Sequence, residues 1–243
     1  MVSLVAETAA MGPSDDVVDV GFGFAQQDIL WVERFAPRHI TGLNVTPSQV
    51  RIARRRVDRR GMNDRIKLLE GSATDMRLSA SSCDVVTAVE SAFHFDTRER
   101  FFAEVFRVLR PGGRVVLADL IRNAPAAHPL ARAMQDCIWS GFARTFAVPP
   151  ANADRRDGYA EMLRASGFDE MRVISISEHV FSGWHRALRE DRALMRRLPL
   201  AGRLPHIRFY AVSRHTPFTA PSTTYLPRLK KHADVTLSGR DPI

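Results

Sequence analysis

The sequence predicts an α/β protein with a doubly wound, mostly parallel sheet of seven strands and an antiparallel last strand. Short β-branched runs alternate with amphipathic stretches in the first half of the chain, which is typical of βαβ units. These runs are continuously apolar, as expected when helices cover both faces of a parallel sheet. With 243 residues, of which 45% are hydrophobic, the chain can form a large buried core.

The strands are predicted from short apolar runs. In chain order they are Val17–Val20, His39–Leu43, Ile66–Leu69, Val85–Val89, Val115–Leu120, Met171–Ile176 and His206–Ser213. Helical spacing separates them. The predicted helices are Val5–Met11, Asp28–Phe35, Pro47–Arg60, Arg98–Leu109 and Tyr159–Ser166, and residues 124–146 are predicted to be helical with a loop. Pro47 fits the first turn of its helix, where its missing N–H costs no hydrogen bond.

The helix over Arg98–Leu109 is expected to end at Pro111, Gly112 and Gly113 and to turn into the fifth strand. No linker divides the chain, so residues 1–215 are expected to form one domain, with a cap inserted at about 121–158. From Thr216 onward Pro, Ser, Thr and Lys dominate, and residues 216–243 are expected to be a loosely ordered tail.

Composition excludes several classes. No apolar run approaches the ~20 residues of a membrane span, and the start has no basic segment typical of a signal peptide. Cys83 and Cys137 have neither metal-ligand nor disulfide spacing, which favours free thiols in the cytoplasm. No metal site is expected. The sequence leaves open whether copies associate into a homo-oligomer.

The net charge of +8 comes mostly from arginines in two clusters, residues 51–60 and 186–203. Such a charge is compatible with a nucleic-acid partner. However, the first cluster shares its helix with Ile52, Ala53 and Val57, and no aromatic residues stand between the arginines. The preferred interpretation is a solvated helix face, and nucleic acid is not the expected partner.

The clearest chemical signal is a glycine turn after the first strand. Asp19, Gly21 and Gly23 form the pattern D-x-G-x-G, and the glycines allow close backbone approach to a ligand at the carboxyl end of the strand. Gln26 stands where a dinucleotide-binding turn needs a third glycine. Asp19, expected to point into the turn, would repel phosphate but suits a cationic ligand. Both observations favour S-adenosylmethionine, which has an ammonium and a sulfonium.

On these residues the sequence resembles the class I S-adenosylmethionine-dependent methyltransferases of the small-molecule branch, which have a Rossmann-like fold. The similarity covers about Val17–Leu120. It implies that Asp19, Gly21 and Gly23 hold the methionine part of the cofactor, with S-adenosylhomocysteine as product. Ala25 replaces the third small residue of the family's turn.

The resemblance extends to two further cofactor segments. In the segment after the second strand, Asn44 and Gln49 match, and Asn44 or its neighbour is implied to pair with the ribose hydroxyls. A turn residue before the next helix is the alternative role of Asn44. After the third strand, Ser72 and Ala73 are implied to lie along the adenine, with Ser72 in place of the family's Asp.

The segment after the fourth strand contains Glu90 and His94, which match a Glu-Ser-x-x-His pattern of relatives. The resemblance implies that Glu90 lies near the methionine moiety and the reaction centre, and that His94 faces the acceptor. An imidazole with an ordinary pKa near 6.5 suits a general base for a hydroxyl. A purely structural role of His94 stays open.

The expected function is methyl transfer to a small, apolar natural-product or lipid-like acceptor, at oxygen or carbon. The acceptor pocket is expected under residues 124–146 and 181–184. Its apolar side chains, which also suit core packing, are Met134, Ile138, Trp139, Phe142 and Phe146. Two alternatives remain: a non-catalytic S-adenosylmethionine-binding protein and an RNA methyltransferase.

Overall fold

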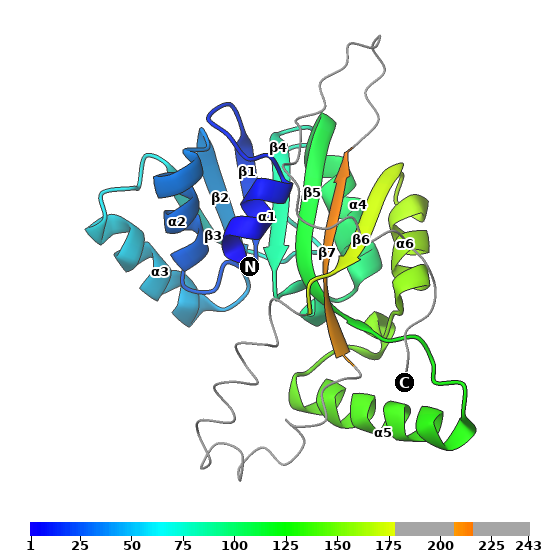
Figure 1. Cartoon of the computed structure of the whole chain (residues 1–243). Helices are drawn as coiled ribbons and strands as arrows, with labels where there is room; N and C mark the ends of the chain where they lie inside the picture. Colours follow the sequence, from blue (N-terminus) through cyan, green and yellow to red (C-terminus); the bar gives the residue numbers. More distant parts are fainter. Residues whose placement is uncertain (178–206, 216–243) are drawn as a thin grey trace.

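In the computed structural model, a seven-stranded sheet forms the centre of the protein (Figure 1). The structure describes residues 1–177 and 207–215. The strand order is β3-β2-β1-β4-β5-β7-β6, and β7 (Ile207–His215) runs antiparallel to both of its neighbours. The predicted fold class, including the antiparallel last strand, is confirmed.

The other six strands are parallel and begin or end within a few residues of the predicted runs. They are β1 (Asp16–Val20), β2 (His39–Asn44), β3 (Ile66–Glu70), β4 (Cys83–Val89), β5 (Leu109–Arg122) and β6 (Glu170–Ser175). Successive side chains of a strand point to opposite faces of the sheet. Val17 therefore packs in one core cluster, and its neighbour Val18 in the other. This explains the continuously apolar runs.

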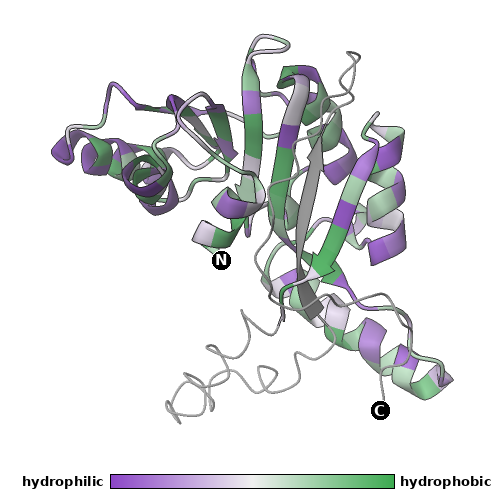
Figure 2. Cartoon of the chain, turned by 45° about the horizontal axis from the view of Figure 1, so that its top comes forward, coloured by the Kyte–Doolittle hydropathy of each residue, from purple (hydrophilic) through white to green (hydrophobic). Residues whose placement is uncertain are grey.

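Helices cover both faces. The helices α1 (Val2–Thr8), α2 (Gln26–Phe35) and α3 (Pro47–Arg59) contribute to one core cluster, whereas α4 (Arg98–Val108) and α6 (Arg156–Ala165) contribute to the other. Figure 2 shows the apolar residues along the central strands between these layers. The Trp31 indole, fully buried, donates a hydrogen bond to Val2 O at 3.0 Å and so joins α2 to α1.

The sequence predicted that a helix ends at the Pro111–Gly113 segment, and this prediction is wrong. Helix α4 ends at Val108, and the segment lies inside β5. Pairing with β4 shifts there, from Cys83 opposite Leu109 to Val85 opposite Arg114. Proline cannot donate to the sheet, so a bulge accommodates it. A Cβ on Gly113 would lie 2.8 Å from Arg110 O, which explains why this position needs glycine.

Two predicted helices are displaced. The first begins at Val2 and ends at Thr8, instead of spanning Val5–Met11. The long helix α5 (Pro129–Thr145) begins five residues later than predicted, where the His128 ring accepts a hydrogen bond from Leu130 N at 3.3 Å. Proline in its first turn fits this start. Phe106 on α4 is 41% exposed.

Helix α5 lies beyond the carboxyl ends of the parallel strands (Figure 1). On α5, Trp139 is buried, whereas Leu130 and Met134 are exposed. A short 3-10 turn, η2 (Pro150–Asn152), follows and leads back to α6. Within the described part of the chain, no helix is long and apolar enough to cross a membrane.

Candidate functional site

The motifs singled out in the sequence meet at one edge of the sheet. This edge is formed by the carboxyl ends of β3, β2, β1 and β4. Three hydrogen bonds join the segments that follow β1, β3 and β4 to the ends of neighbouring strands: Gly21 N to Leu43 O at 2.8 Å, Gly71 N to Asn44 O at 3.1 Å, and Ser91 Oγ to Val20 O at 2.8 Å. Ligands of open parallel sheets bind at such an edge.

The two glycines of the turn have different surroundings. Both have positive φ angles, +84° at Gly21 and +56° at Gly23. A Cβ added to Gly21 would lie 2.4 Å from Ser91 Cβ, whereas one added to Gly23 would meet nothing within 4 Å. Gly21 is therefore required by packing against β4's loop, and Gly23 borders open space. Ala25 also has a positive φ, +57°, in the position where the family pattern has a small residue.

Gly21→Ala is expected to lower the free energy of unfolding more than Gly23→Ala. Each alanine pays roughly 1–2 kcal/mol for the left-handed backbone, but only the first adds a clash, with the Ser91 side chain. Overpacking of this kind costs roughly 1–3 kcal/mol. Urea unfolding of both variants measures the difference. If the two variants lose the same free energy of unfolding, the Ser91 side chain moves away from the added Cβ at no cost in stability.

Asp19 is fully buried, and both of its carboxylate oxygens accept hydrogen bonds from within the protein. One oxygen accepts a hydrogen bond from Thr87 Oγ1 on β4 at 2.8 Å, and the other accepts one from Gln27 Nε2 at 2.7 Å. Burial raises the pKa of Asp19 to about 6, against the effect of these two donors. The carboxyl is thus held between Thr87 on β4 and Gln27 on α2.

Asn44 and Gln49 are in contact. The Asn44 amide donates to Gln49 Oε1 at 2.8 Å and to Gly23 O at 3.4 Å, while its own oxygen accepts from Thr46 N at 2.9 Å. The last bond is the turn role that the sequence analysis left open. The same side chain thus connects the glycine turn with the start of α3, beside the open space at Gly23.

Ser72 and Ala73 follow β3 on the same edge. The Ser72 hydroxyl lies 3.0 Å from Thr74 Oγ1 and accepts a hydrogen bond from Thr74 N at 3.1 Å. Ala73 is buried. Ser72 therefore shapes a local turn, and a carboxylate for an adenine amino group is absent at this position of the sequence.

Glu90 has a φ of +52°, a left-handed conformation that is uncommon for residues other than glycine. Its N–H donates to Ala118 O at 2.8 Å, which fixes the residue at the end of β4. The surrounding protein removes water from the Glu90 carboxyl, and this desolvation raises its pKa. Backbone strain of this kind concentrates at functional sites.

His94 ends the 3-10 turn η1 (Ala92–His94). Its ring, part of which is open to solvent, lies 4.1 Å from the Phe93 ring, measured between centroids. Partial burial lowers the pKa of His94, although the backbone of Ala147 and Phe146 acts in the opposite direction. The ring thus lies near the end of α5. A neutral imidazole is the form that accepts a proton.

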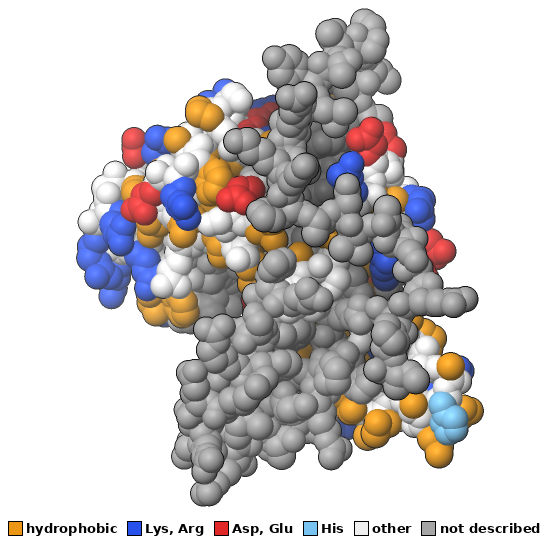
Figure 3. All heavy atoms as spheres, in the orientation of Figure 1, with side chains coloured by type: hydrophobic (Ala, Val, Ile, Leu, Met, Phe, Trp, Pro, Cys, Tyr) orange, Lys and Arg blue, Asp and Glu red, His pale blue; other side chains and the backbone are white. Residues whose placement is uncertain are grey.

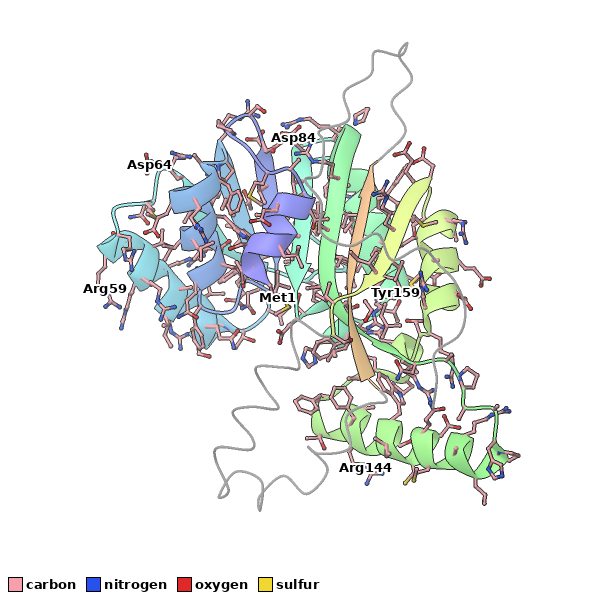
Figure 4. The ribbon with its side chains drawn as sticks, viewed as in Figure 1. Met1, Arg59, Asp64, Asp84, Arg144 and Tyr159 are labelled. Carbon is pink, nitrogen blue, oxygen red and sulfur yellow. The ribbon has the colours of Figure 1, made fainter. Side chains whose placement is uncertain are left out.

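A buried ion-pair network supports η1, and the sequence analysis missed it. Arg98 is fully buried and donates to Asp119 Oδ2 at 2.9 Å and to Asp154 Oδ2 at 3.0 Å. Burial opposes its charge, but the carboxylates hold the pKa of Arg98 above its usual value. Tyr159, labelled in Figure 4 on α6, donates to the same Asp119 oxygen at 3.0 Å.

Asn152 connects this network to η1. Its amide donates to Phe93 O at 3.2 Å and to Phe95 O at 2.6 Å, and its oxygen accepts from Arg98 N at 3.0 Å. The carbonyls on either side of His94 are therefore held by η2, 57 to 59 residues later in the chain. The network positions the loop that contains His94.

No group of three or more His, Cys, Asp or Glu side chains with the arrangement of a metal site occurs among residues 1–177 and 207–215. Cys83 is buried and Cys137 exposed, and both are free thiols. Burial raises the pKa of Cys83 to about 12, so this thiol stays protonated.

Residues 18–117 match the family model of the methyltransferase domain. The chain is 38% identical over 186 residues to erythromycin 3''-O-methyltransferase of Saccharopolyspora erythraea, a match that covers 74% of this chain and 59% of that protein. The chain thus spans about three fifths of the length of this relative.

Two solved structures show the same fold. Geranyl diphosphate C-methyltransferase of Streptomyces coelicolor A3(2), determined with Mg²⁺, geranyl diphosphate and S-adenosyl-L-homocysteine, superposes with a TM-score of 0.72 at 17% identity. That match covers 88% of this chain and 76% of the other. The [4+2]-cyclase SpnF superposes with a TM-score of 0.67 at 20% identity over 89% and 80% of the two chains.

Proposed function

The chain belongs to the class I S-adenosylmethionine-dependent methyltransferases, and from this premise we propose that it methylates a small, apolar natural-product or lipid-like acceptor at oxygen or carbon. The observation that carries the proposal is the glycine turn at the carboxyl end of β1. There, an added Cβ at Gly23 would meet open space, and the carboxylate of Asp19, four residues earlier, is buried. This combination suits a cationic ligand in close contact with the backbone.

The residues present fit the cofactor. Gly21 and Gly23, with Asp19 behind them, would hold its methionine part, and Glu90 lies at the neighbouring strand end. Asn44 and Gln49 would hold the ribose. Their oxygens are already acceptors, yet each oxygen has a second lone pair for a hydroxyl donor. The segment with Ser72 and Ala73 would border the adenine.

The chemistry that S-adenosylmethionine supplies when bound is an electrophilic methyl group on a sulfonium. The chain has to align the acceptor and exclude water. We assign His94 as the general base for a hydroxyl acceptor, because its lowered pKa keeps the imidazole neutral at pH 7. The Asn152 contacts to the loop on both sides hold this ring at the sheet edge.

Three aromatic rings of α5 and its end support an apolar acceptor. Trp139 and Phe142 have ring centroids 5.6 Å apart, and Phe142 and Phe146 are stacked at 4.5 Å. Phe146, next to His94 through its backbone, is 47% exposed. Met134 is exposed as well and lies one turn before Ile138. The predicted second part of this wall, Phe181–Trp184, lies outside the described residues.

The test is binding of S-adenosylhomocysteine by calorimetry, with Gly23→Ala and Gly61→Ala compared. Gly61 is a matched control because it also has a positive φ, +64°, and also has no atom within 4 Å of an added Cβ, but it lies after α3. Both variants should lose similar stability. Only Gly23→Ala should weaken binding, by about tenfold or more. No heat from the folded wild-type protein at millimolar ligand would overturn the proposal.

Methyl transfer is expected to proceed without a divalent metal. The described residues offer no cluster of ligands at the sheet edge, and a neutral thioether leaving group needs no cation to stabilise it. The measurement is the methylation rate before and after treatment with a chelator. A rate that falls on chelation and returns with added Mg²⁺ or Zn²⁺ would contradict this expectation.

A non-catalytic or non-methylating role is the alternative within the same fold, since SpnF, which has this fold, is a [4+2]-cyclase. In this alternative the protein has the same cofactor site but transfers no methyl group to an acceptor. Methyl release from labelled S-adenosylmethionine to an acceptor distinguishes the two, because a binding protein would retain the ligand unchanged.

RNA methylation is the other alternative, favoured by the basic charge of α3, visible at one end of the molecule in Figure 3. A hollow of about 520 Å³ between α3 and β3 includes Arg54, Arg55 and Lys67, but it lies away from the glycine turn. Arg54 donates two hydrogen bonds to Leu68 O, so it also anchors the helix to the sheet. Strongly salt-dependent RNA binding would support this alternative.

We further propose that the acceptor is a small molecule and not a nucleic acid, and that the protein acts in the cytoplasm. Free thiols support a reducing compartment. For the arrangement of the chain, we propose that residues 121–158, with α5 and η2, cap the acceptor side of a methyltransferase domain spanning residues 1–215. Whether a homo-oligomer forms can be measured by sedimentation.

A further inference from the structure

Asp28 has surroundings that its place in a helix does not explain. It lies in the first turn of α2 and is fully buried. Neither of its carboxyl oxygens has a hydrogen-bond partner. A buried carboxylate without a donor is costly, by several kcal/mol on general grounds. A group in this state calls for a specific physical reason.

The neighbouring group is a second buried carboxyl, that of Asp19, whose charge acts directly on Asp28. Two carboxylates cannot donate hydrogen bonds to each other, but a carboxylic acid can donate to a carboxylate. Like charges in a shared buried site favour the protonation of one of them. The missing donor at Asp28 is therefore explained if Asp28 itself holds a proton.

We propose that Asp28 is a positioning residue whose protonated carboxyl donates a hydrogen bond to Asp19, so that the pair keeps one negative charge behind the glycine turn. The Asp19 carboxylate would then accept three hydrogen bonds, from Asp28, Gln27 and Thr87. In the described chain, Gln27 on α2 and Thr87 on β4 are neutral, and Asp19 is the titratable group whose charge acts on Asp28.

The consequence for ligand binding rests on the proposed function. A buried carboxylate with three donors stays ionised near neutral pH, whereas one that loses a donor takes up a proton more readily. The remaining charge on Asp19 complements the positive charge of the methionine part of S-adenosylmethionine. Without Asp28 the turn would keep its glycines but lose this charge.

The pair also makes the stability of the folded protein depend on pH, whether or not a ligand is bound. Burial, and then the Asp19 charge, raise the pKa of Asp28 in the folded protein, and burial raises that of Asp19. The folded chain therefore binds more protons than the unfolded chain above the ordinary pKa of Asp, about 4. Stability falls as the pH rises from there through the folded pKa values.

The first experiment compares the wild-type protein with Asp28→Asn, which keeps the shape and a donor but cannot lose a proton. The infrared band of a protonated carboxylic acid should be present at pH 7 in the wild type and absent in the variant. Between pH 5 and pH 8 the melting temperature should fall more steeply in the wild type. No difference in the band would overturn the proposal, whatever the ligand.

The second experiment measures binding to two ligands in Asp28→Asn and Asp28→Leu. S-adenosylhomocysteine has the amino-acid part, and 5′-methylthioadenosine lacks it. Asp28→Leu should bind the first about tenfold to a hundredfold more weakly and the second as well as wild type, whereas Asp28→Asn should bind both normally. Equal losses for both ligands would make Asp28 structural and overturn the proposal. Wild-type protein that binds neither ligand would instead refute the proposed function and leave the infrared result to decide the pair.

Discussion

Replacing Arg98 by methionine is expected to lower the free energy of unfolding by about 3–5 kcal/mol. Arg98 and Asp119 are both fully buried, and their side chains meet at 2.9 Å. Methionine keeps much of the volume of the arginine stem but removes the charge, so Asp119 is left without its cation in the interior. The loss is a large fraction of the 5–15 kcal/mol by which domains are usually stable.

Arg100→Met is the matched control, because Arg100 lies on the same helix and its side chain is 62% exposed, with its ion pair to Asp96 at 4.0 Å. Exposed pairs of this kind contribute little. Urea unfolding of both variants measures the comparison. The double variant Arg98→Met/Asp119→Leu should recover part of the loss, since the fully buried carboxylate of Asp119 is then removed together with its cation. Equal effects of Arg98→Met and Arg100→Met would refute the structural role of the network.

Because Asn152 joins this network to the carbonyls of Phe93 and Phe95, its loss should reach the site as well. An Arg98→Met protein that still folds is expected to have a more mobile η1. Hydrogen exchange of the amides of residues 92–95 would report it as faster exchange relative to the β1 turn. The conformation of η1 is thus set by a contact between segments far apart in the sequence.

The fold could be predicted because its signals are local. Runs such as Val85–Val89 are buried on both faces, and each run is recognisable without knowledge of its neighbours. The Pro111–Gly113 segment was misinterpreted because a bulge within a strand and a helix end use the same residues. The sequence contains the glycines, whereas the partner strand that requires the bulge is set by the tertiary structure.

The chemical roles were harder to predict. The motif residues Asp19, Asn44 and Glu90 could be found because each lies at or next to the carboxyl end of a recognisable strand. Their partners could not, since Thr87 is 68 residues from Asp19 and Tyr159 is 40 residues from Asp119. Asp28 was assigned only to a helical pattern. Its lack of a donor is visible only when the packing around the buried carboxyl is known.

His94→Ala is expected to reduce turnover of a hydroxyl acceptor by ~10²-fold or more, the usual scale of general-base catalysis. The affinity for S-adenosylhomocysteine should stay nearly unchanged, because the proposed cofactor contacts come from the ends of β1, β2, β3 and β4 and do not include His94. His39→Ala is the control. Burial lowers the pKa of His39 too, but His39 lies at the opposite edge of the sheet, where β2 begins.

The pH profile gives this prediction a second readout. Because partial burial lowers the pKa of His94 below 6.5, the wild-type rate should rise with pH through that lowered pKa and be level at neutral pH. The rise should disappear in His94→Ala and persist in His39→Ala. A carbon acceptor would lose less rate, since no hydroxyl proton has to be removed. For a hydroxyl acceptor, an unchanged rate in His94→Ala would make the histidine structural, and a parallel loss of cofactor affinity would indicate instead that η1 had collapsed.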